Sequence, residues 1–180
     1  MRTLASILAA LVVSILIAVT ARAHAGPPRA FPRLDHGACP GECCQYGRWT
    51  AGRLTVARVQ PDRRSAEAFR VAPGEVVEAI TGIVITLRPG RARAIAPVEI
   101  DGVPIPAGTE VVVLSHAGEG VYKIWFAGRM LMATLLPADA AQLTLLIEPR
   151  IVWWVQIRNR DGRTGWIDQA DRFDGADACA

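Results

Sequence analysis

The chain has 180 residues, of which 51% are hydrophobic and 21% charged, and its formal net charge is +3. Residues 1–25 contain two arginines and no acid, so removing them would leave a formal charge of about +1. A chain so close to neutral lacks the basic surface typical of nucleic-acid-binding proteins, and we expect no nucleic-acid partner. The length suffices for one domain, or two small ones, to bury a hydrophobic core.

The first 25 residues have the pattern of a secretion signal peptide. Arg2 supplies the positive start, residues 4–19 are almost wholly apolar, and Ala23-His24-Ala25 offers small residues for a signal peptidase. An uncleaved membrane anchor is the alternative, because the apolar run approaches the roughly 18 residues that a spanning helix needs. The break at Gly26-Pro27-Pro28 favours cleavage. The sequence therefore predicts a periplasmic or secreted protein with no membrane span after cleavage.

Residues 26–44 are expected to form an extended lead-in that contains three of the four cysteines. Four cysteines in an exported chain predict two disulfides. A bond between the adjacent Cys43 and Cys44 would be strained, which leaves two of the three pairings open. We favour Cys39–Cys44 together with Cys43–Cys179, the latter in a tail of residues 176–180. The second bond would tie the two ends of the chain together.

Metal or thiol-redox chemistry is the alternative for the same segment. His36, Cys39 and Cys43 would offer one imidazole and two soft thiolates, a set that suits Cu(I). Their spacing matches neither the Cys-x-x-Cys pairs of structural zinc nor those of thioredoxin-like redox sites. We therefore expect disulfides and no cofactor, and keep a periplasmic copper or redox factor as a second hypothesis.

After the cysteine segment the chain is strand-like almost throughout, which predicts an all-β fold. Residues 54–59 alternate apolar with polar or small side chains. The apolar runs 76–80 and 83–87 flank Thr81-Gly82, which predicts a hairpin there. Residues 138–146 could form either a short helix or a strand.

A degenerate internal repeat predicts two units. Pro73-Gly74-Glu75-Val76-Val77 is echoed by Ala107-Gly108-Thr109-Glu110-Val111-Val112. We expect two small barrels in tandem, a divergent one over residues 45–98 and a more complete one over residues 99–175. A single barrel with an elaborated first half is the alternative.

The clearest local signal is a β-hairpin near the C-terminus. Residues 153–158 and 164–168 are β-rich runs that flank the turn Asn159-Arg160-Asp161-Gly162. Side chains alternate between the two faces of a strand. Trp153, Val155 and Ile157 therefore share the face expected in the core, and Trp154 lies on the other face with Gln156 and Arg158.

This hairpin resembles bacterial SH3-like (SH3b) barrels. The resemblance covers mainly residues 108–173, through Trp154-Val155-Gln156-Ile157-Arg158 and Gly162-Arg163-Thr164-Gly165-Trp166-Ile167. The segment Cys39-Pro40-x-Glu42-x-Cys44-x-Tyr46-x-x-Trp49 is also similar to the start of uncharacterised exported bacterial proteins of this kind. The resemblance implies a small binding or targeting barrel that engages cell-wall material or peptide. It retains both cysteines of the favoured Cys39–Cys44 bond and implies no catalytic activity.

The candidate binding residues are aromatic and cationic side chains of the second unit. We expect Trp125 and Trp154 to form an exposed aromatic shelf, with Tyr122 as a further contact residue. Arg158 or Arg160 would offer charge-assisted hydrogen bonds to an acidic group. The alternative is that these aromatic side chains fill the barrels or the space between them.

Nothing in the sequence predicts an enzyme. Ser115 and His116 are neighbours on a strand, so their side chains point apart and cannot form a nucleophile–base pair. No Gly-x-Ser-x-Gly, His-Glu-x-x-His or phosphate-binding glycine motif occurs. We therefore predict an exported, non-enzymatic protein that binds peptide, protein or peptidoglycan, or is a structural part of the cell envelope.

Overall fold

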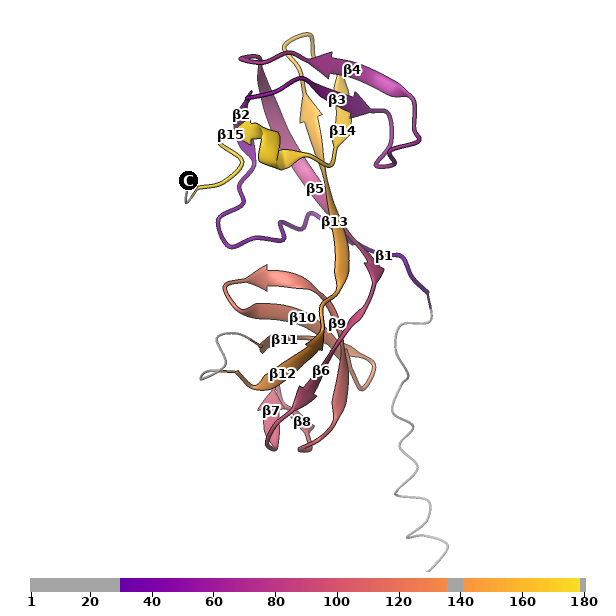
Figure 1. Ribbon diagram of the computed structural model, residues 1–180, viewed down its shortest axis with the longest axis vertical. Coiled ribbons are helices and arrows are strands. Elements are labelled where there is room, and N and C mark those ends of the chain that lie inside the picture. The colour runs from indigo at the N-terminus through magenta and orange to yellow at the C-terminus, as the bar shows by residue number, and fades with distance from the viewer. Residues whose placement is uncertain (1–29, 136–140, 179–180) are drawn as a thin grey trace, which may run out of the picture.

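The computed structural model describes residues 30–135 and 141–178, and their regular secondary structure is nearly all β-strand. Figure 1 shows two lobes joined by two long strands, β5 (Val76–Arg88) and β13 (Arg150–Arg158). A short 3-10 turn, Ala170–Arg172, is the only helical element among these residues. The expectation of an all-β fold is confirmed. Within the described residues, no helix has the length and apolarity needed to cross a bilayer.

The first sheet forms one lobe and the bridge between the two. It has eight strands in the order β15-β2-β5-β13-β14-β3-β4, with β1 beside β5. The other strands of this sheet are β1 (Arg33–His36), β2 (Gly47–Ala51), β3 (Thr55–Arg58), β4 (Glu67–Val71), β14 (Thr164–Ile167) and β15 (Phe173–Asp174). Its core is a cluster of fully buried side chains that includes Trp49, Val71, Val155, Ile157 and Ile167.

The second sheet curls into a half-barrel in the other lobe (Figure 1). Its strand order is β11-β10-β9-β6-β12, and a separate hairpin, β7-β8, lies against it. The strands are β6 (Gly90–Ala94), β7 (Val98–Ile100), β8 (Val103–Ile105), β9 (Glu110–Gly118), β10 (Val121–Phe126), β11 (Arg129–Thr134) and β12 (Leu143–Ile147). Ile105, Tyr122, Ile124, Leu131 and Leu143 are buried in its core.

The two lobes are nested in the chain and do not follow one another. The second sheet is built from residues 90–147, between β5 and β13 of the first sheet. The C-terminal hairpin therefore pairs with β5 and lies outside the lobe that contains residues 110–134. The sheets do not follow the expected division into residues 45–98 and 99–175, because strand pairing joins the two ends of the chain across the insertion.

β5 is one strand of 13 residues, and the hairpin expected at Thr81-Gly82 does not form. Ile83 and Val84 point to opposite faces of β5 and are both buried, so both faces of this part of the strand are covered. A strand that is buried on both faces has a continuous apolar run. Gly82 serves close packing: a Cβ there would lie 2.6 Å from the Tyr46 hydroxyl and 3.0 Å from the Ala38 carbonyl oxygen.

The hairpin expected over residues 153–168 is confirmed as β13 and β14. The Asn159 side-chain oxygen accepts hydrogen bonds from the backbone N–H groups of Asp161, at 3.1 Å, and Arg163, at 2.9 Å. Gly162 has a φ of 79°, a conformation that glycine adopts without strain. Earlier in the chain, β12 covers Leu143–Ile147, so the strand alternative is correct for residues 143–146, while residues 138–140 lie outside the described residues.

Candidate functional site

The cysteine segment forms a disulfide-closed loop beside the C-terminal residues. The Cys39–Cys44 bond forms as predicted, with the two Cα atoms 5.9 Å apart. Cys43 is also disulfide-bonded, while its expected partner, Cys179, lies outside the described residues. The Ala178 N–H donates to the Cys43 carbonyl at 2.7 Å, and this hydrogen bond holds the chain end against the loop.

These disulfides contradict the ligand set proposed for copper. Cys39 and Cys43 both have their sulfur in a disulfide, so neither offers the thiolate on which that hypothesis depends. His36 lies at the end of β1 and is exposed. The His36, Cys39 and Cys43 set is therefore wrong as a metal centre for the oxidised protein.

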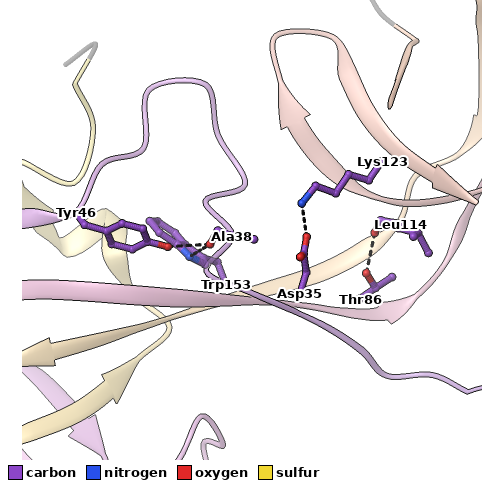
Figure 2. Close-up of polar contacts among 7 residues, drawn as sticks. All are labelled: Asp35, Ala38, Tyr46, Thr86, Leu114, Lys123 and Trp153. Atoms are coloured by element: carbon purple, nitrogen blue, oxygen red, sulfur yellow. Dashed lines mark hydrogen bonds and ion pairs between the residues drawn. The ribbon is translucent and has the colours of Figure 1, made fainter. Parts of the chain in front are cut away.

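Two aromatic side chains fix the start of the cysteine loop. The Tyr46 hydroxyl donates to the Ala38 carbonyl at 2.9 Å, and the Trp153 indole N–H donates to the same oxygen at 3.1 Å (Figure 2). Burial raises the pKa of Tyr46, which keeps its hydroxyl protonated as a donor. Trp153 lies on the core side of β13 as expected, and it serves here as a structural anchor.

The strand β1 contacts both lobes. It pairs with β5 along one edge and reaches β10 with its side chains. Asp35 forms an ion pair with Lys123 of β10 (Figure 2), and the Arg33 guanidinium lies 5.5 Å from the centre of the Trp125 ring. The buried Thr86 hydroxyl donates to the Leu114 carbonyl at 2.9 Å, which joins β5 to β9.

The exposed aromatic shelf does not form. Trp154 is only 4% exposed and packs with Ile83 and Ile85, while Tyr122 is 1% exposed and lies inside the half-barrel. Trp125 is half-buried and belongs to the other sheet from Trp154. The prediction failed for Trp154 because its face of β13 is covered too. It failed for Tyr122 because its strand curls around a core.

Tyr122 has polar neighbours at the edge of that core. Its hydroxyl donates to the Glu148 carboxylate at 3.4 Å, and the His116 ring lies 4.3 Å away, centre to centre. Burial raises the pKa of Tyr122, and the negative charge of Glu148 raises it further. These contacts hold Tyr122 in place and leave it no surface for a ligand.

The two predicted cationic residues lie at the far end of β13, at its turn into β14. Arg158 is exposed and forms an ion pair with Glu78 at 2.9 Å. Arg160 is also exposed, and its side chain lies 3.9 Å from the Asp161 carboxylate. Both arginines line a cavity of about 190 Å³ whose lining residues include none of Trp154, Trp125 and Tyr122.

A cavity of about 590 Å³ lies over the face of β5 and β13 that holds Trp154. Its floor is apolar and includes Ile85, Leu87, Val152 and Trp154, and we call it the Trp154 groove. The loop between β3 and β4 forms one wall with Pro61, Asp62, Arg63 and Arg64, and Pro32 and Arg150 also line it. Trp154 therefore lines a candidate site, although it lies in the floor of a cavity and not on an exposed shelf.

Three arginines and two aspartates, Asp62 and Asp168, line the Trp154 groove. Arg63 is ion-paired with Asp168, which also lines the groove. Arg64 and Arg150 are exposed, and neither has an ion-pair partner within the described parts of the chain. The groove therefore presents two available guanidinium groups beside an apolar floor, an arrangement that suits a ligand with a carboxylate.

A second cavity, of about 640 Å³, lies beside the cysteine loop. Trp153 and Phe173 line it together with four acidic residues, Glu42, Asp171, Asp174 and Asp177. All four are exposed, which is the ordinary state of a solvated carboxylate. Among the residues described, no three histidine, cysteine or acidic side chains are grouped so as to hold a metal ion.

The chain matches no protein-family model, no curated protein and no solved structure.

Proposed function

We propose that this is an exported, non-enzymatic protein of the cell envelope that binds an extended peptide segment bearing a carboxylate. The observation that carries the proposal is the Trp154 groove, in which an apolar floor lies beside Arg64 and Arg150. A volume of about 590 Å³ lies within the range typical of ligand sites, roughly 300–1,000 Å³.

The two parts of the groove would recognise two parts of such a ligand. An apolar side chain would lie on Leu87 and Val152, the more exposed parts of the floor, where removing it from water is favourable. The carboxylate would accept hydrogen bonds from a guanidinium group, whose planar fork suits it. Two sources share this chemistry: a segment of a partner protein, and the peptide stem of peptidoglycan. The same groove could also dock the chain into an envelope assembly.

The resemblance to bacterial SH3-like modules belongs to this proposal. It rests on the C-terminal hairpin, which belongs to the first sheet, whereas residues 110–134 and 143–147 belong to the curled second sheet. The apolar N-terminal segment supports export, and the disulfides are consistent with an oxidising compartment.

Binding measurements with two arginine variants test the proposal. Fluorescent peptides with a free or an amidated C-terminus, and insoluble peptidoglycan, would be offered to the wild type and to the Arg64→Gln/Arg150→Gln double variant. A hydrogen bond to a charged group contributes about 1.5–3 kcal/mol, so affinity should fall by about 10- to 100-fold for each bond lost. Amidation of the peptide should cause a similar loss.

Arg160→Gln is the matched control, because Arg160 is an exposed arginine outside the groove. It should leave binding unchanged. Retention on peptidoglycan alone would identify the peptide stem as the ligand, and binding to free peptides alone would identify a protein segment. Equal binding by the wild type and the double variant would show that the groove is not the site.

A further inference from the structure

The methionines of this chain are placed in an unusual way. There are three, at positions 1, 130 and 132. Met130 and Met132 lie on β11 with 46% and 44% of their surface exposed, while Leu131 between them is buried. Methionine usually fills gaps in hydrophobic cores. None of the three described core clusters contains one, and Met130 and Met132 lie on the same exposed face of an edge strand.

An aromatic ring lies on the same face. Trp125 pairs directly with Met130 in the β10–β11 register, and such partners have their Cβ atoms about 4.5–5.5 Å apart. The Trp125 ring already accepts one cation, the guanidinium of Arg33, at 5.5 Å from its centre. This face therefore brings together two soft sulfur donors and a ring that attracts positive charge.

We propose that Met130 and Met132 bind one soft monovalent metal ion, Cu(I) in the cell, beside the Trp125 ring. Thioethers are soft ligands that favour Cu(I). Residues i and i+2 of a strand are about 6.6 Å apart, and the three rotatable bonds of each methionine allow both sulfurs to reach one ion. The site is distinct from the disulfide-bonded cysteine segment and from the Trp154 groove.

The surrounding charges select the kind of ion. Lys123 pairs with Met132 in the register and is neutralised by its ion pair with Asp35, while Arg33 keeps its charge beside Trp125. Hard divalent ions such as Ca²⁺ and Mg²⁺ need oxygen ligands, and this cationic setting opposes them. An ion held by sulfur donation and carrying a single charge is repelled least.

Titration with Ag(I), a redox-inert substitute for Cu(I), tests the site. The protein, with its disulfides intact and treated with iodoacetamide to block any free thiol, would be titrated by calorimetry and by tryptophan emission. One Ag(I) should bind per chain. Met130→Leu/Met132→Leu should weaken binding by at least about 10- to 100-fold, the range seen for the loss of even outer-shell partners. Competition with bicinchoninate would then measure Cu(I) binding.

Two further variants separate the roles. Trp125→Phe should retain one Ag(I) by calorimetry and lose the change in emission, whereas Trp125→Leu should weaken binding about two- to fivefold. His36→Gln/His116→Gln is the control and should bind Ag(I) as the wild type does. An absence of Ag(I) binding by the wild type would overturn the proposal. So would full binding by the double methionine variant, or loss of binding in the histidine control.

Discussion

Tyr46 and Tyr122 are the only tyrosines of the chain, and burial raises the pKa of both hydroxyls above 10.0. A raised pKa in the folded state favours the neutral phenol there. Its contribution to stability is complete below the pKa of the unfolded state, near 10, and is lost as the pH rises through the folded pKa. We expect both tyrosines to titrate above pH 10.0 in the native protein, and Tm to fall in the same pH range. The absorbance of tyrosinate measures the first, and a native midpoint at or below 10.0 would contradict it.

Gly82 is a residue at which one added methyl group should disturb the local packing. A Cβ there would clash with the Trp153 indole nitrogen and lie 2.6 Å from the Tyr46 hydroxyl, the two donors that hold Ala38. Gly82→Ala should lower the free energy of unfolding by about 1–3 kcal/mol, the usual cost of overpacking. Denaturant unfolding measures this. Gly41→Ala is the control, because its Cβ would meet Cys44 at an ordinary 3.8 Å, and a similar loss there would refute this account.

At the scale of elements, the short strand β1 joins the lobes through the Asp35–Lys123 ion pair. Both partners are mostly shielded from water, so a double-mutant cycle with Asp35→Asn and Lys123→Gln should give a coupling energy of about 1 kcal/mol, within the 0.5–3 typical of coupled neighbours. The same cycle on the exposed Glu78–Arg158 pair should give less, because water and salt screen it. Equal coupling energies in the two cycles would show that the Asp35–Lys123 pair joins the lobes no more strongly than an exposed ion pair does.

The sequence predicted the elements whose signals are local. The β13–β14 hairpin follows from a turn that bonds within itself, and the Cys39–Cys44 bond closes over five residues. β1 was missed because its Pro- and Arg-rich surroundings read as an extended lead-in, and its partner strand lies some fifty residues away. The Trp154 groove was missed for the same reason: its floor and its wall come from segments far apart in the chain. Alternation placed Trp154 on the correct face but could not show that this face is also covered.

At the scale of the whole molecule, the nested order separates a continuous lobe from a discontinuous one. Every buried core residue of the second lobe falls between Ala92 and Leu143, so the core of that lobe is built from one stretch of chain. The first core cluster draws on residues from Trp49 to Ala176 and needs β13 and β14 to close. A tandem pair of units would divide the chain near residue 98. In the nested arrangement, residues 89–149 are the only stretch, among the described residues, that contains a complete core of its own.

Two fragments of similar length distinguish these arrangements. Residues 89–149 should show a cooperative thermal transition by circular dichroism, although with a low Tm, since a domain of about 60 residues buries only about 60% of its unfolded surface. Residues 45–98 should remain unfolded, because Val77 and Ala79 would face water where Val155 and Ile157 pack in the intact chain. The reverse result would support tandem units, since strands that fold without β13 and β14 cannot depend on them for their core. If the 89–149 fragment folds, the insertion can fold before the first lobe does. Its two ends would then bring together β5 and β13, which flank it in the chain.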